Sequence, residues 1–161
     1  MSGERISLHG TIGYFAGDGA HTGRELFSVS READGSSVLR AHCVMEDDAL
    51  VRDCLLALGP GDTPREALVR TIEGGKSLGS GHYRFVSDRI RADIAPADGE
   101  PERIERAGPC RFFGTHSLVN DGWIARALAG ASRGDITVHA NSLAANGGGV
   151  PGLFETRAVG E

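Results

Sequence analysis

Closely spaced glycine and proline residues are the feature that most limits how this chain can fold. The 161 residues include 24 glycines and 6 prolines, which divide the sequence into short segments. Both residue types interrupt helices and strands, so this punctuation favours a meander of short strands over a bundle of long helices. The length suits one hydrophobic core, and we expect residues 1–161 to form a single domain.

Several segments alternate between apolar and polar residues, the pattern of a strand with one buried face. In the first of them, Glu25, Phe27 and Val29 share one side, and the dipeptide Asp34-Gly35 that follows indicates a hairpin turn. The expected strands are residues 24–31, 38–45, 50–58, 64–72, 79–86, 89–94, 135–143 and 153–159. Their regular spacing is typical of a sandwich or barrel.

One segment has helical periodicity instead. Its apolar residues, at helical spacing, are Leu118, Val119, Trp123, Ala127 and Leu128. We expect one helix near residues 118–129, with Ser117 or Asn120 as its N-cap and Gly130 at its C-terminal end.

Composition limits the partners and the cellular compartment. The 17 basic and 22 acidic residues give a net charge of −5, which disfavours nucleic-acid binding. The longest apolar run, residues 54–58, is far too short to span a membrane, and the start of the chain has no apolar signal segment. The three cysteines have no C-x-x-C spacing, so we expect no disulfide framework and a cytoplasmic location.

No motif calls for a cofactor or a metal. Residues 74–77 (Gly-Gly-Lys-Ser) end like a phosphate loop, but Arg70 stands where that motif needs a glycine. The histidines lack the H-x-x-x-H and H-E-x-x-H spacings of metal sites. We therefore expect chemistry without a cofactor or metal ion.

Ionisable residues inside apolar segments are the candidates for function. Alternation sends Arg52 and Asp53 to opposite faces of a sheet, so one of them points inward and needs a partner or a wet cavity. A structural ion pair and a catalytic group both remain open there. His116 and Asp121 lie at an expected loop-to-helix junction, where they can exchange protons or simply stabilise the helix terminus.

Three histidines lie in different expected strands: His42, His82 and His139, the last two flanked by Tyr83 and Asn141. If their faces line one interior, they form a polar patch that can orient a carbonyl or hydroxyl group. If the faces point outward, they are surface residues.

The succession of short strands, with one helix before the last strands, resembles the lipocalin-like or calycin class of antiparallel barrels. Gly13-Tyr14-Phe15 stands where lipocalins carry Gly-x-Trp, and the only tryptophan is Trp123. The resemblance implies a mainly β fold, a single antiparallel β-barrel that holds a small apolar molecule. Several proteins of this broad shape are cofactor-independent lyases, isomerases or cyclases.

We therefore expect a cofactor-independent acid–base enzyme, a lyase, dehydratase or isomerase, acting on a small hydrophobic terpenoid, aromatic or polyketide. The alternatives are a non-catalytic carrier of an apolar ligand and an interaction module that forms a homodimer through a sheet edge or the Trp123 helix. The expected catalytic residues are His116, Asp121, Asp53 and Arg52. The expected substrate-binding residues are Tyr83, Asn141, Met45, Phe85, Phe113, Trp123 and His42.

Overall fold

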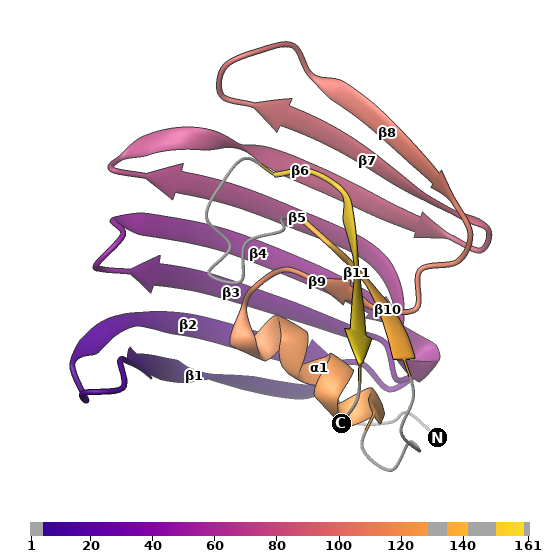
Figure 1. Ribbon diagram of the computed structural model, residues 1–161. Coiled ribbons are helices and arrows are strands. Elements are labelled where there is room, and N and C mark those ends of the chain that lie inside the picture. The colour runs from indigo at the N-terminus through magenta and orange to yellow at the C-terminus, as the bar shows by residue number, and fades with distance from the viewer. Residues whose placement is uncertain (1–4, 129–134, 142–150, 160–161) are drawn as a thin grey trace.

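The computed structural model describes residues 5–128, 135–141 and 151–159, which form two β-sheets and a helix (Figure 1). The strands of the larger sheet are β1 (Ile6–Phe15), β2 (His21–Arg31), β3 (Ser37–Met45), β4 (Leu50–Gly59), β5 (Thr63–Glu73), β6 (Lys76–Val86), β7 (Arg89–Pro96) and β8 (Glu102–Ala107). The smaller sheet contains β9 (Phe113–Gly114), β10 (Asp135–Ala140) and β11 (Phe154–Val159). Helix α1 spans Leu118–Leu128, and a 3₁₀ turn at Pro60–Asp62 joins β4 to β5.

Each strand of the larger sheet pairs antiparallel with the strand that follows it in the sequence. Tight turns make this meander possible. Between β5 and β6, Gly74 and Gly75 have φ angles of 55° and 78°, in the left-handed region where a side chain would be strained. The register places opposite residues in rows that cross the sheet, and one such row contains Glu25, Cys43, Arg52 and Thr71.

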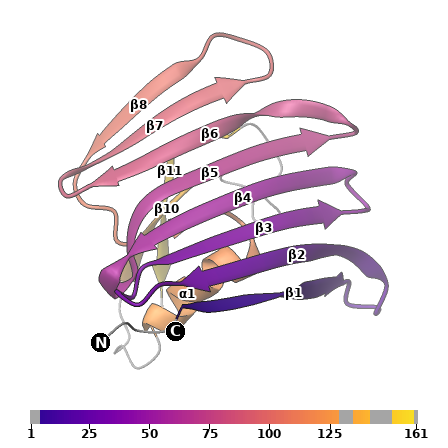
Figure 2. The same ribbon diagram turned by 180° about the vertical axis from the view of Figure 1, so that it is seen from behind.

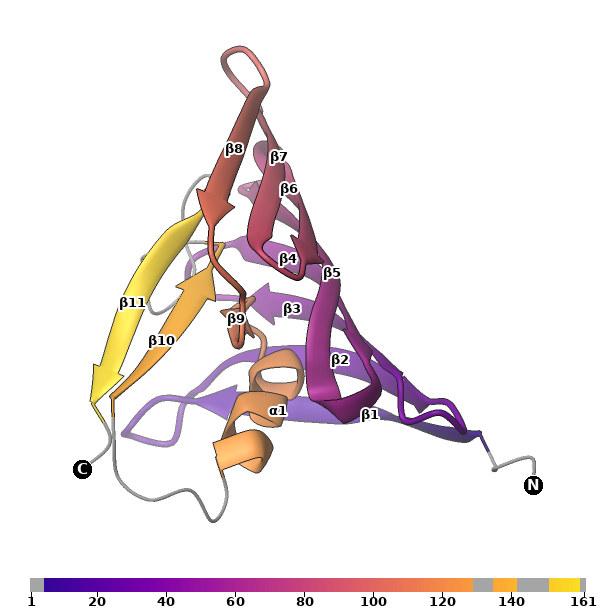
Figure 3. The ribbon, with the colours of Figure 1, turned by 90° about the vertical axis from the view of Figure 1, so that its right-hand side faces the viewer.

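The two faces of the larger sheet have different surroundings. Helix α1 and the smaller sheet lie against one face, here called the covered face (Figures 1 and 3). The other face, here called the open face, has no described helix or strand over it (Figure 2). The hydrophobic core lies on the covered face and includes Leu39, Cys54, Leu56, Ala67, Val69, Tyr83, Ile90 and Ala92, together with Phe112, Phe113 and Trp123 from the cover.

The expected mainly β fold with a helix at 118–129 is confirmed, and so are the expected strands within the described residues. The larger sheet is not closed, because β1 and β8 each pair with a single strand, so the described residues do not form the closed barrel that we expected. The proposed helix end at Gly130 and the last residues of the expected strand 135–143 lie outside the described residues.

Three strands were not expected, and each has a physical reason. In β1, Ile6, Leu8, Ile12 and Tyr14 do alternate with polar or small residues, but the glycines at positions 10 and 13 interrupt the segment, and glycine is disfavoured in strands. In β8, Ile104 is the only large apolar residue. Strand β9 has two residues, too few for any periodicity, and it pairs parallel with β10.

The two edges of the larger sheet differ in charge. Strand β8 reads ERIERA, and charged side chains discourage another strand from pairing with an exposed edge. Strand β1 reads ISLHGTIGYF and carries no lysine, arginine, aspartate or glutamate. The homodimer expected through a sheet edge stays a prediction, and β1 is the edge that it would use.

Candidate functional site

The structure divides the expected catalytic residues between the two faces of the sheet. Arg52 points to the covered face and is 2% exposed, whereas the next residue, Asp53, points to the open face. His116 and Asp121 lie on the covered side with Arg52, at the start of α1. The expected set therefore does not form one site.

On the covered face, Arg52 holds the segment that leads into α1. Its Nη1 atom donates a hydrogen bond to the backbone carbonyl of His116 at 2.8 Å. The neighbouring thiol of Cys54 lies 3.6 Å from the carbonyl of Thr115. His116 has a φ of 57°, an unusual conformation for a residue with a side chain, and these contacts fix the backbone there.

Asp121 binds the same segment from the helix. Its Oδ1 atom accepts the backbone N–H of Thr115 at 2.8 Å. Burial raises the pKa of the Asp121 carboxyl to about 6, even though the N–H of Thr115 and the nearby His116 favour the charged form. Such a pKa suits proton transfer, but neither of the pockets on the open face, nor the hollows beside Trp123, is lined by Asp121.

Glu25 is a buried carboxylate that binds the start of α1, and it was not among the candidate residues predicted from the sequence. It is fully buried on β2, where its carboxylate accepts hydrogen bonds from the side chains of Tyr14 at 2.5 Å and Ser117 at 2.9 Å. It also accepts the backbone N–H groups of Leu118 and Val119, both at 2.9 Å. A carboxylate at the N-terminus of a helix satisfies N–H groups that have no partner within the helix.

Of the two residues that we expected as the N-cap of α1, Ser117 takes this position and Asn120 lies inside the helix. The Ser117 hydroxyl oxygen accepts the backbone N–H of Asn120 at 3.3 Å while donating to Glu25. In the sequence, the pattern that could have identified Glu25 as buried is its place on the same side of the strand as the apolar residues Phe27 and Val29. Burial and the Glu25 hydrogen bond also raise the pKa of Tyr14, which keeps its hydroxyl protonated as a donor.

Three of the four expected substrate-binding aromatic residues pack against one another, and the fourth, Trp123, packs on Phe112. The Phe113 ring centroid lies 4.7 Å from that of Tyr83 and 5.0 Å from that of Phe85, and Trp123 packs on Phe112 at 5.6 Å. The Tyr83 hydroxyl donates to the carbonyl of Gly152 at 2.7 Å. These rings fill the space between the sheets, and Trp123 also borders hollows of about 410 and 170 Å³.

The other expected residues are scattered. Asn141 is buried after β10, and its backbone N–H donates to Gly114 at 3.3 Å. Met45 lies at the end of β3, opposite Leu50, and is partly exposed. His139 belongs to the smaller sheet, so it does not share a face with His42 and His82, which both point to the open face.

The open face carries a pocket of about 500 Å³ over the centre of the larger sheet. Its floor includes Leu55 and Leu68, directly opposite each other on β4 and β5, and Ala95 on β7. Leu68 is 42% exposed. The polar side chains around the floor are Arg40, Asp53, Arg70, Ser80, His82 and Asp93. A second hollow of about 410 Å³ adjoins the pocket at Arg40 and Asp53 and extends to Leu26 and His42.

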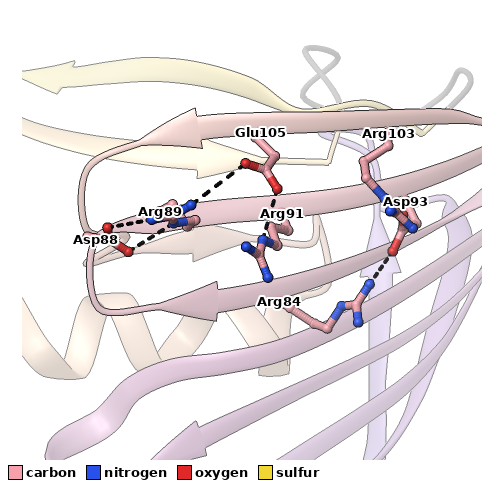
Figure 4. A network of polar contacts seen from close by, with 7 residues as sticks. All are labelled: Arg84, Asp88, Arg89, Arg91, Asp93, Arg103 and Glu105. Carbon is pink, nitrogen blue, oxygen red and sulfur yellow. Dashed lines mark hydrogen bonds and ion pairs between the residues drawn. The ribbon is translucent and has the colours of Figure 1, made fainter.

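Two histidine–carboxylate pairs border these hollows. His42 Nδ1 and Asp53 Oδ1 are 2.7 Å apart, and His82 Nε2 and Glu66 Oε1 are 2.6 Å apart. Each pair joins neighbouring strands, β3 to β4 and β5 to β6. Beyond them, an ion-pair network covers β6 to β8, formed by Arg84, Asp88, Arg89, Arg91, Asp93, Arg103 and Glu105 (Figure 4).

No group of three or more His, Cys, Asp or Glu side chains among the described residues is arranged to hold a metal ion. Nor does any described helix have the length and apolar character to cross a membrane. Comparisons with protein-family models, with curated proteins and with solved structures find no match.

Proposed function

We propose that this protein binds a small, largely apolar molecule in the pocket on the open face. The observation that carries the proposal is the exposed apolar floor of Leu55 and Leu68 within a hollow of about 500 Å³. Pockets for small ligands commonly have this size, with a mostly apolar lining and a few polar groups. The outer face of an antiparallel sheet is usually polar, so apolar side chains at its centre call for an explanation.

We expected the ligand inside a barrel, and we now propose that it binds in the pocket on the open face. In a lipocalin-like barrel the ligand lies inside, on the face that α1 covers here. Tyr83, Phe85 and Phe113 pack together on that side, with ring centroids 4.7 and 5.0 Å apart. We therefore place the small hydrophobic ligand on the opposite side of the same strands.

The binding test uses N-phenylnaphthylamine, a neutral apolar dye whose fluorescence rises in apolar surroundings. We expect saturable binding to the wild-type protein and at least fivefold weaker binding to Leu68→Asn, since burial of a leucine side chain contributes about 1.5–3 kcal/mol. The matched control is Val86→Asn, because Val86 is 46% exposed on β6 but does not line the pocket. Equal affinity of the two variants would refute the proposed site.

Proton transfer on the bound molecule is the second candidate function. It is favoured by the His82–Glu66 pair, because His82 lines the pocket and a carboxylate bonded to one imidazole nitrogen orients the ring. The bond at Nε2 leaves Nδ1 as the nitrogen to exchange a proton with a ligand. In this version Asp53 and His42 stay part of the site, whereas Arg52, His116 and Asp121 have structural roles on the other side of the sheet.

Incubation with terpenoid, aromatic and polyketide compounds, followed by mass spectrometry of the products, distinguishes an enzyme from a carrier. If the protein is an acid–base enzyme, the wild type converts a compound that the His82→Gln variant leaves unchanged. The variant should still bind the neutral dye. A compound that binds and is recovered unchanged from the wild-type protein would favour the carrier.

A further inference from the structure

Two arginine side chains that line the pocket on the open face take no part in the ion pairs around it. Arg40 lies on β3 and Arg70 on β5, and both line the pocket. Within residues 5–128, 135–141 and 151–159, neither guanidinium has a hydrogen-bond or ion-pair partner.

The carboxylates around the pocket are, by contrast, already bound to other side chains. The pairs are Asp53 with His42, Glu66 with His82, and Asp93 with both Arg84 and Arg103. Asp53 lies directly opposite Arg70 in the register, yet its Oδ1 atom is bonded to His42 at 2.7 Å. The charged side chains lining the pocket that have no bonded partner among the described residues are therefore Arg40 and Arg70.

We infer that the ligand is an amphipathic organic anion whose acidic group binds between Arg40 and Arg70 while its apolar part lies on Leu55 and Leu68. This inference rests on the proposed function and adds the chemical class of the ligand. Guanidinium groups bind carboxylate, sulfonate and phosphate oxygens through paired hydrogen bonds, so the acidic group belongs to one of these types.

The register brings the two arginines to the same part of the floor. Arg40 lies opposite Leu55, which in turn lies opposite Leu68, and Arg70 is two residues from Leu68 on the same face of β5. Strands β3 and β5 are separated only by β4, which corresponds to about 10 Å. Two arginine side chains at that separation can both reach a group held above Leu55.

Because the whole protein is negatively charged, binding of an anion tests for a local positive site. With a net charge of −5, the chain as a whole repels small anions, so preferential binding of an anion reports on a local site. Two dyes with the same ring skeleton separate the contributions. Anilinonaphthalene sulfonate carries a sulfonate, and N-phenylnaphthylamine lacks it.

We expect the wild-type protein to bind the sulfonate about tenfold more tightly than the neutral dye, the size of effect given by charge-assisted hydrogen bonds to an exposed site. Arg40→Gln and Arg70→Gln should each lower the sulfonate affinity severalfold, by a larger factor than they change the affinity for the neutral dye. The matched control is Arg24→Gln, because Arg24 is exposed on the same face of β2 and does not line the pocket.

The possible failures are distinguishable. If the neutral dye binds and the sulfonate gains nothing, the anion inference is overturned and the proposed function stands. If Arg24→Gln weakens sulfonate binding as much as Arg70→Gln does, the effect is one of general charge and the inference is again overturned. If neither dye binds, the proposed function fails together with the inference.

Discussion

Arg52 and Asp53 are consecutive residues of β4 whose side chains make their hydrogen bonds on opposite sides of the same sheet. Arg52 donates to the carbonyl of His116 at 2.8 Å beneath α1, and Asp53 bonds to His42 at 2.7 Å on the open face. Arg52 is 2% exposed, whereas the side chains of Asp53 and its partner His42 are 50% and 46% exposed. The two residues should therefore respond differently to substitution.

We expect Arg52→Met to lower the free energy of unfolding by about 2 kcal/mol, because it leaves a buried carbonyl without its donor. Asp53→Asn should change it by less than about 1 kcal/mol, as is usual for an exposed ion pair. Urea unfolding measures both values. Binding of the neutral dye by folded Arg52→Met should match the wild type, and a loss there would contradict the assignment of the site to the open face.

The Glu25 carboxylate should be a major contributor to stability. Glu25→Gln keeps the shape of the side chain but replaces one acceptor oxygen with an NH₂ donor among groups that all donate. We expect a loss of about 2–3 kcal/mol, compared with about 1–2 kcal/mol for Tyr14→Phe, which removes a single donor.

A double-mutant cycle in urea tests this coupling. The two losses should be less than additive, because both variants remove the same hydrogen bond. The exposed Glu100→Gln is the control and should leave stability unchanged. Full additivity would mean that Tyr14 and Glu25 act independently, contrary to the 2.5 Å contact.

Asp121 should make stability depend on pH. Burial raises its pKa from 3.8 to about 6 in the folded protein, so between these values the folded state holds a proton that the unfolded state has released. Its stabilising contribution is therefore complete below about pH 4 and is lost as the pH rises through 6. A shift of this size corresponds to about 2–3 kcal/mol.

Urea unfolding of the wild type and Asp121→Asn between pH 4 and pH 7 checks the sign. The asparagine does not titrate, and its Oδ1 atom can still accept the N–H of Thr115. We expect the wild type to lose stability relative to Asp121→Asn as the pH rises. A constant difference across this range would show that the carboxyl keeps an ordinary pKa.

Gly81 should tolerate no side chain. On the covered face of β6 it lies under the ring of Tyr83, and an added Cβ would be 2.4 Å from the Tyr83 hydroxyl oxygen. Gly81→Ala should cost about 2 kcal/mol through displacement of the packed ring. Gly17→Ala is the matched control, because an added Cβ there meets nothing within 4 Å, and thermal unfolding should show little change.

The sequence predicts the central strands well because their alternation reflects burial. Leu39, Ala41 and Cys43 share one side in the sequence, and all three are buried. Alternation also separates Arg52 from Asp53. It does not say which of them is covered, since that depends on where α1 packs, and a change of face exchanges every inward and outward residue.

No short stretch of the sequence predicts the site on the open face. Arg40 and Arg70 belong to different strands, and only the register of β3, β4 and β5 brings them to one pocket. The partners of Glu25 were equally unpredictable, because Ser117 lies 92 residues away in the sequence. Local patterns record which face of a strand is apolar, and contacts between distant segments need the complete fold.

The order of strands in the larger sheet affects how the chain can assemble. Because β1 to β8 pair in sequence order, each strand can join the sheet as it leaves the ribosome. The helix that covers Glu25 and Arg52 is synthesised only afterwards. Until it docks, the surface that becomes the core displays a hydrated carboxylate and a hydrated guanidinium. These two charges keep the unfinished sheet from being a wholly apolar surface at the stage when it would most readily aggregate.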